Sequence, residues 1–157
     1  MSKKILAILS EYGYWGIELV GPLTKLEEAG YTVEFMTPKG KKAEALPPSY
    51  DTTYMDPPLG VCVTTPEAAD MVKAFEATNR LEERRNMSEV VPERPYFSTP
   101  NFLREFEKYY SDLKIAQEDL TSEYAGLLLV GGSGPIIDIV NNQRVHDIIL
   151  AFYKKDM

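Results

Sequence analysis

The sequence predicts an α/β fold in which a parallel sheet is flanked by helices. Two observations support this class: a strand, helix and strand follow one another within residues 4–37, and "LLLVGGSGPIIDIV" combines an apolar strand, a glycine turn and a helix. A strand, a crossover helix and a second strand form a right-handed βαβ unit, which belongs to a parallel sheet. The 157 residues, 44% hydrophobic and 26% charged, fit one folded domain, 1–157.

The first βαβ unit is predicted element by element. Residues 4–9, "KILAIL", form a short apolar run that is typical of a buried parallel strand. Residues 31–37, "YTVEFMT", alternate and are rich in β-branched and aromatic residues, which predicts a second strand. Between them, Gly30 stands where a helix would end in the left-handed conformation. The apolar positions of that helix recur at helical spacing: Leu19, Leu23, Leu26 and Ala29.

The middle of the chain, residues 38–120, is predicted to be an insertion of helices and loops over the sheet, and to act as a lid. Helices are expected to begin at Thr65-Pro66 and at Thr99-Pro100, because threonine caps a helix and proline fits its first turn. The run "RLEERR" is expected to be a solvated helix end. The second helix carries an aromatic and apolar stripe that predicts a core contact: Phe102, Phe106, Tyr109, Tyr110, Leu113 and Ala116.

The number of predicted strands is small for this class of fold. Only three strands are expected, and the last, "LLLV", is apolar on both faces, which requires helices on each side and neighbouring strands. Such a sheet is incomplete in this chain. Its hydrophobic edge would be open to pairing with another chain.

Composition excludes several functions. The net charge is −7 and no basic cluster forms a phosphate-binding footprint, so nucleic acid is not an expected partner. No apolar run approaches the ~20 residues that cross a bilayer, and "ILAIL" is shorter than a secretory core, so neither a membrane nor export is expected and the cytoplasm is the expected location. One histidine and one cysteine give no metal-ligand spacing, so neither a metal nor a cofactor is expected.

The two glycine-bearing turns, "SEYGYWGIELVGPL" and "LLLVGGSGPIIDIV", resemble those of the ThiJ/PfpI (DJ-one-like) family in the class I glutamine-amidotransferase-like superfamily. The resemblance is greatest to the larger chaperone-and-glyoxalase type, which has an insertion after the second strand, and it covers the N-terminal portion of that type. It implies a flavodoxin-like sheet and a cysteine nucleophile on a strand-to-helix elbow. It also implies a glutamate from the first helix and an oxyanion hole built partly from the glycine turn.

The resemblance carries over to particular residues. Glu18 falls where the family places its acidic residue, and there a carboxyl could exchange a proton with a thiol. Gly131, Gly132 and Gly134 match the glycine turn, where backbone N–H groups could approach a substrate oxygen. The structural alternatives are a glutamate favoured by the helix dipole and glycines required by tight strand-to-helix packing.

Substrate contacts are expected at the carboxyl end of the first strand, where α/β sheets bind ligands. Tyr12, Tyr14 and Trp15 would line this crevice, together with Ser133 of the glycine turn. The expected ligand is a small molecule with an electrophilic carbon.

Ser133 also invites comparison with a serine-hydrolase elbow, because "GGSGP" resembles G-x-S-x-G and Asp138 and His146 follow it. Pro135 replaces the final glycine, however, and both partners would sit on the helix just after the serine. A catalytic triad brings its acid and base from separate loops. A dinucleotide-binding turn is also not supported, because the third glycine of its fingerprint is missing.

The expected nucleophile is absent from the sequence. The helix "VHDIILAFYKK" leads to Met157 with no following strand that ends in cysteine, and Cys62 lies in the proline-rich segment "PPLGVCVTT" instead. Cys62 lacks the strand-turn-helix setting that activates a thiol.

Two hypotheses from different classes follow. In the first, this is the N-terminal chain of a two-chain cysteine-dependent hydrolase, hydratase or glyoxalase-like enzyme, and a second polypeptide, from a separate gene or from cleavage, supplies the C-terminal half and the cysteine in a higher oligomer. In the second, it is a non-catalytic binding or chaperone-like module of the same fold. A shortened chain would explain the missing elbow equally well.

Overall fold

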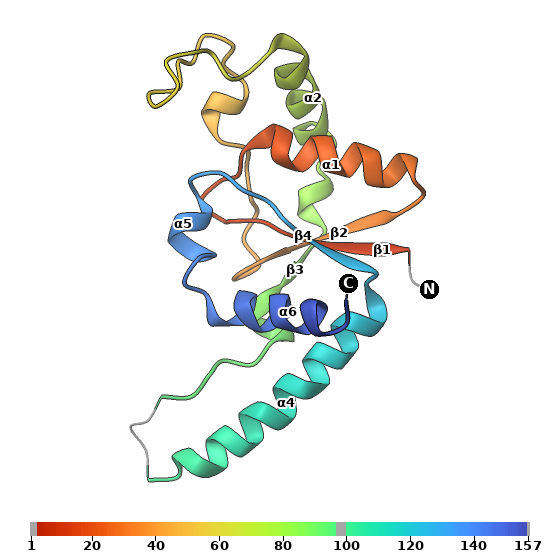
Figure 1. Ribbon diagram of the computed structural model, residues 1–157, viewed down its shortest axis with the longest axis vertical. Coiled ribbons are helices and arrows are strands. Elements are labelled where there is room, and N and C mark those ends of the chain that lie inside the picture. Colours follow the sequence, from red (N-terminus) through yellow and green to blue (C-terminus); the bar gives the residue numbers. More distant parts are fainter. Residues whose placement is uncertain (1–2, 97–99, 157) are drawn as a thin grey trace.

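A four-stranded parallel sheet lies at the centre of the computed structural model, which describes residues 3–96 and 100–156 (Figure 1). Its strand order is β3-β2-β1-β4, with β1 at Lys4–Ile8, β2 at Thr32–Thr37, β3 at Arg84–Asn86 and β4 at Gly126–Leu129. All three pairings are parallel, and Ile5 of β1 lies opposite both Val33 of β2 and Gly126 of β4. The predicted α/β class, with a flavodoxin-like sheet flanked by helices, is confirmed.

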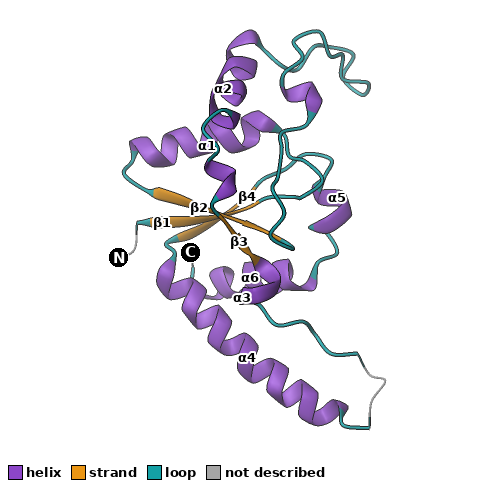
Figure 2. Ribbon diagram, turned by 180° about the vertical axis from the view of Figure 1, so that it is seen from behind, coloured by secondary structure: helices purple, strands orange, loops and turns teal. Residues whose placement is uncertain are grey.

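Helices cover both faces of this sheet (Figure 2). On one face, α1 (Gly16–Glu28) packs with α2 (Pro66–Glu76), and on the other α4 (Phe102–Glu123) packs with α6 (Gln143–Lys154). The short elements are α3 (Met87–Val90), α5 (Pro135–Asp138) and the 3₁₀ turns Pro47–Ser49 and Arg80–Glu82. Two separate hydrophobic cores result, one on each face.

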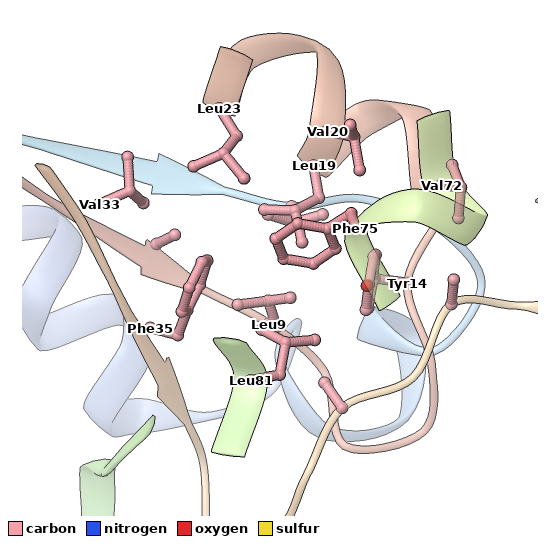
Figure 3. Close-up of a cluster of buried hydrophobic side chains, with 14 of the residues drawn as sticks. Leu9, Tyr14, Leu19, Val20, Leu23, Val33, Phe35, Val72, Phe75 and Leu81 are labelled. Carbon is pink, nitrogen blue, oxygen red and sulfur yellow. The ribbon is translucent and has the colours of Figure 1, made fainter. Parts of the chain in front are cut away.

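The core on the α1 side joins side chains from distant parts of the sequence (Figure 3). Leu19 and Leu23 of α1 pack with Phe35 of β2 and with Val72 and Phe75 of α2. The rings of Phe35 and Phe75 meet edge to face with centroids 6.1 Å apart. Burial of such apolar surface stabilises the fold by roughly 25 cal/mol per Å². Because Val72 and Phe75 are buried in this core, α2 helps to cover the sheet.

Two of the predicted helix boundaries, the end of α1 and the start of α2, are confirmed. Gly30 follows α1 with φ +83°, which is the left-handed geometry expected of it. The Thr65 hydroxyl caps α2 by accepting a hydrogen bond from Ala68 N–H at 3.2 Å, and Pro66 is its first residue. The expected start at Thr99-Pro100 is wrong for Pro100, which lies in a turn, because α4 begins at Phe102 after Asn101. Thr99 lies outside the described residues. In the stripe of α4, Tyr109, Leu113 and Ala116 are buried, whereas Tyr110 is exposed.

The strand β3 was missed by the sequence prediction, which expected three strands and a solvated helix end at "RLEERR". Arg84–Asn86 instead pairs in parallel with β2, so the sheet has four strands among the described residues. Arg85 donates from Nη1 to Tyr124 Oη at 2.7 Å and to Glu123 Oε2 at 2.8 Å. Charged residues are tolerated here because β3 is short and at the sheet edge, and hydrogen bonds to the end of α4 hold it. The predicted insertion, 38–120, therefore contributes both β3 and α2 to the main layers.

The opposite edge of the sheet is formed by β4. Within the described part of the chain, β4 pairs with β1 alone, so its outer backbone groups have no strand beside them. Leu129 of β4 is 44% exposed, and Ile136, Ile137 and Val140, in and just after α5, are also exposed. An apolar strand with an open edge favours pairing with a further strand.

Candidate functional site

The site expected from the sequence forms where the β1–α1 turn meets the β4–α5 turn. The strands β1 and β4 are neighbours, although more than a hundred residues separate them, and the chain places β2 on the other side of β1. This reversal of strand order is a topological switch point, and open α/β sheets bind ligands there, beyond the carboxyl ends of the strands. The two turns are tied together by a hydrogen bond from Trp15 N–H to the carbonyl of Gly131, 2.9 Å long.

Glu18 lies in the first turn of α1, and its side chain is exposed. Its carboxylate rests against Gly131, because a Cβ atom placed on that glycine would lie 2.1 Å from Glu18 Oε2. The structure therefore brings Glu18 and the glycine turn together, as the resemblance implied. A carboxylate in this position can accept a proton from a group that approaches from outside the present chain.

The glycines of the turn allow backbone segments to approach more closely than side chains would permit. Gly132 has φ +122°, a conformation that other residues rarely adopt, and its Cβ would meet Trp15 N at 2.7 Å. A Cβ on Gly134 would lie 2.0 Å from the carbonyl oxygen of Gly13. Tight packing of the two turns, the structural alternative considered for these glycines, is therefore a real feature of the molecule.

The backbone N–H groups of the same turn are free. None of the four N–H groups from Gly131 to Gly134 donates a hydrogen bond within the described part of the chain. Unpaired N–H groups at a switch point are available to an oxygen of a bound molecule. Packing and an oxyanion-binding function are thus compatible at this turn.

The residues expected to contact substrate do not share one environment. Tyr12 is 60% exposed, Trp15 is half-buried and Ser133 is exposed. Tyr14 has no exposed surface and lies in the core (Figure 3). Its hydroxyl donates a hydrogen bond to Glu76 Oε1 at 2.5 Å. The side chain of Tyr14 is therefore part of the α1–α2 core, where a crevice contact was expected. Tyr12 is exposed, whereas Gly13 and Tyr14 are buried, so the chain turns into the core between Tyr12 and Tyr14.

Two cavities open beside the β1–α1 turn. The larger, of about 600 Å³, lies at the carboxyl ends of β1 and β2 and reaches the start of α6. The smaller, of about 270 Å³, lies between the β1–α1 turn and residues 42–47. Glu11 and Tyr12 line both cavities, whereas Glu18 and Ser133 line neither. Sequence analysis missed the larger cavity, although Lys39 and Lys41, directly after the second strand, were a possible signal.

The other chemically reactive residues do not assemble into a catalytic set. Cys62 is exposed in the loop before α2. The carboxylate of Asp138 accepts from Glu11 N–H at 2.8 Å, and His146 Nε2 lies 2.8 Å from the carbonyl oxygen of Val140, so no hydrogen bond links either residue to Ser133. Within residues 3–96 and 100–156, no group of three histidine, cysteine or acidic residues could hold a metal ion.

Raising the pH above 10 should destabilise the protein, and Tyr14 is one cause. Burial, the hydrogen bond to Glu76 and the charge of Glu76 raise the pKa of Tyr14 above its ordinary value. Because the unfolded phenol ionises near pH ~10, the unfolded state loses its proton first, and the free energy of unfolding falls as the pH rises further. Urea unfolding between pH 8 and 11 measures this fall.

The matched variant is Tyr14→Phe, which removes the ionisable hydroxyl and keeps the ring. Above pH 10 the free energy of unfolding of this variant should fall less steeply than that of the unaltered protein. The difference in slope should be up to about 1.4 kcal/mol per pH unit, which corresponds to one proton. Burial also raises the pKa values of Tyr109 and Tyr124, so some pH dependence should remain. An unchanged slope in Tyr14→Phe would contradict the assignment.

Together the sheet order and the site define a flavodoxin-like α/β protein with an acidic residue beside a glycine turn at the switch point. The family model described as ThiJ/PfpI family-like matches residues 9–156, and the chain belongs to this family. Proteins of this family are often cysteine-dependent enzymes. No curated protein matches the chain. Among the described residues, no helix has the length and apolar character needed to cross a membrane.

Proposed function

We propose that this chain is the N-terminal part of a ThiJ/PfpI-type cysteine-dependent enzyme whose nucleophile is carried by a second polypeptide. The reaction is of the hydrolase, hydratase or glyoxalase-like type, and the substrate is a small molecule with an electrophilic carbon. The observation that carries the proposal is the open edge of β4 next to a site that holds Glu18 and free N–H groups but no thiol among the described residues.

The position of the site supports this arrangement. A strand that paired with the outer edge of β4 would end at the same edge of the sheet as the turn at Gly131, because parallel strands share their carboxyl ends. A cysteine just after such a strand would come close to the Glu18 carboxylate. The exposed side chains of Leu129, Ile136 and Val140 would become buried if the added polypeptide also covered this region.

The proposed chemistry uses the site in one sequence of steps. Glu18 accepts the proton of the thiol, and the resulting thiolate bonds to the electrophilic carbon of the substrate. The electron pair of the carbon–oxygen double bond moves to the oxygen, where N–H groups of the turn from Gly131 to Gly134 stabilise the negative charge. Glu18 can then return its proton to that oxygen or to a leaving group.

Thiol labelling of the native assembly tests the proposal. The protein is purified from its source through a tag on this chain that also carries Cys62→Ser, and is treated with iodoacetamide over a range of pH. We expect a second polypeptide in equal amount, with one cysteine that reacts rapidly near neutral pH. Glu18→Ala should change the pH dependence of that labelling, since the thiol loses its proton acceptor.

Two results would count against the proposal. An assembly that contains no reactive thiol after Cys62 has been removed would favour a non-catalytic module of the same fold. If a reactive cysteine is found but the pH dependence of its labelling is the same in Glu18→Ala, the carboxylate does not accept the proton of that thiol. If the cysteine lies on the same polypeptide, the two-chain arrangement fails while the chemistry stands.

A further inference from the structure

We propose that the larger cavity, separate from Glu18, binds a small carboxylate that also carries an amino or hydroxyl group. The cavity has a volume of about 600 Å³, enough for a small metabolite, and lies between the carboxyl ends of β1 and β2 and the start of α6. Its lining residues come from four segments that are distant in the sequence. This inference goes beyond the function proposed above, because it concerns a different site.

The charges that line the cavity favour a ligand with one negative group. Four cationic residues, Lys39, Lys41, Arg94 and Arg144, face three carboxylates, so the formal charge of the lining is +1. The ammonium groups of Lys39 and Lys41 form no ion pair in the part of the chain that the structure describes. The single excess positive charge matches a ligand that carries one negative group, such as a carboxylate.

Two of the three acidic residues are already occupied. Glu11 Oε1 accepts hydrogen bonds from the backbone N–H groups of Lys39, at 2.5 Å, and Lys41, at 3.1 Å. Glu93 is paired with Arg144 at 3.4 Å. These contacts reduce the repulsion that a carboxylate would meet and leave the lysine side chains available to it.

The third carboxylate, Asp138, indicates the second group of the ligand. Asp138 lines the cavity, and its Oδ2 accepts a hydrogen bond from Glu11 N–H at 2.8 Å. Its Oδ1 is buried and has no hydrogen-bond partner among the described residues. A buried polar atom without a partner is rare and costly, and a small rotation of the Asp138 carboxylate into the cavity would let an ammonium or hydroxyl group of a ligand satisfy it.

The wall formed by Arg144 and Arg94 is held in place by the protein itself. The Arg144 side chain is 22% exposed and donates from Nε to the carbonyl of Val91 at 2.8 Å. Arg94 lies over the Phe106 ring, with its guanidinium carbon 5.8 Å from the centroid. Pre-positioned cations lose little conformational freedom when an anion binds, which favours recognition.

Titration calorimetry of the full chain tests the proposal with four probes: L-alanine, D-glycerate, propionate and glycerol. Propionate has only the carboxylate, glycerol has only hydroxyl groups, and the first two probes combine both features. We expect saturable binding of L-alanine or D-glycerate, at least tenfold tighter than that of propionate or glycerol. Tighter binding of L-alanine would indicate that an amino group lies opposite Asp138, and tighter binding of D-glycerate would indicate a hydroxyl group.

Two variants assign the binding to this cavity. The double variant Lys39→Met, Lys41→Met should weaken binding of the preferred probe at least tenfold, while Lys154→Met, Lys155→Met, which removes two exposed lysines at the end of α6, should leave it unchanged. Asp138→Asn should reduce the advantage over propionate. If Asp138→Asn does not fold, the exposed lysine variants still decide the question.

Three outcomes would overturn the proposal: no saturable binding of any probe at millimolar concentration, equal affinity for propionate and the preferred probe, or an equal effect of the two lysine variants. Each would show that the charged residues of the cavity do not bind a small carboxylate with an amino or hydroxyl group.

Discussion

In the two-chain enzyme proposed above, replacing Glu18 with alanine should lower kcat/KM by about 10²- to 10⁴-fold, the usual contribution of a positioned proton-transfer group. The carboxylate is the acidic group that the structure places against the glycine turn. Because the side chain is exposed, the free energy of unfolding should change by no more than about 0.5 kcal/mol. Steady-state kinetics with a small aldehyde or amide substrate, together with urea unfolding, measures both quantities.

The matched control is Glu28→Ala, which removes another exposed glutamate from the same helix. Glu28 pairs with Lys25 at the far end of α1, away from the switch point, so kcat/KM should remain unchanged. Full activity in Glu18→Ala would rule out proton transfer by this carboxylate. A large loss of stability in that variant would instead assign Glu18 a structural role.

The largest effect on stability is expected for Gly134→Ala, which should lower the free energy of unfolding by at least about 1–3 kcal/mol, as overpacking of a core does. The added Cβ would lie 2.0 Å from the carbonyl oxygen of Gly13 and 2.7 Å from Oγ of Ser10. The carbonyl belongs to the backbone of the β1–α1 turn, so it cannot move without shifting the turn. Urea unfolding of the isolated chain provides the measurement.

Two other glycines provide controls for this experiment. Gly21 lies within α1 and nothing would contact its added Cβ within 4 Å, so Gly21→Ala should raise stability by about 0.5–1 kcal/mol. In Gly131→Ala the three atoms nearest to the added Cβ all belong to the Glu18 carboxylate, a flexible group, so activity should fall more than stability. A stability of Gly134→Ala equal to that of the unaltered protein would contradict the close approach of the two turns.

The proximity of Glu18 to the glycine turn was predictable from sequence. The apolar run at 4–9 and the later "LLLV" run both indicated buried parallel strands, and in such a sheet the turns at the carboxyl ends lie along one edge. The resemblance to the ThiJ/PfpI family then indicated which residues of those turns to consider. The structure confirms the family's fold and brings Glu18 against Gly131.

Other features depended on contacts that no local pattern records. The strand β3 consists of two arginines and an asparagine, and it pairs with β2 while Arg85 bonds to Tyr124, almost forty residues later. Tyr14 was expected in the crevice because it follows the carboxyl end of the first strand, but its partner Glu76 comes from α2 and holds it in the core. The larger cavity likewise combines segments from four parts of the chain.

The sequence by itself determined the α/β class, two of the helix boundaries and the position of Glu18 in the first turn of α1, because periodicity, capping and glycine conformation are local properties. Only the tertiary structure decided that a charged segment becomes a fourth strand. It also decided that, within the described residues, the outer edge of β4 has no partner strand and Asp138 Oδ1 has no hydrogen-bond partner. These features arise from strand pairing, burial and electrostatic interactions between residues that are far apart in the sequence. Such residues come close to one another only in the folded chain, so no local sequence pattern reports these interactions.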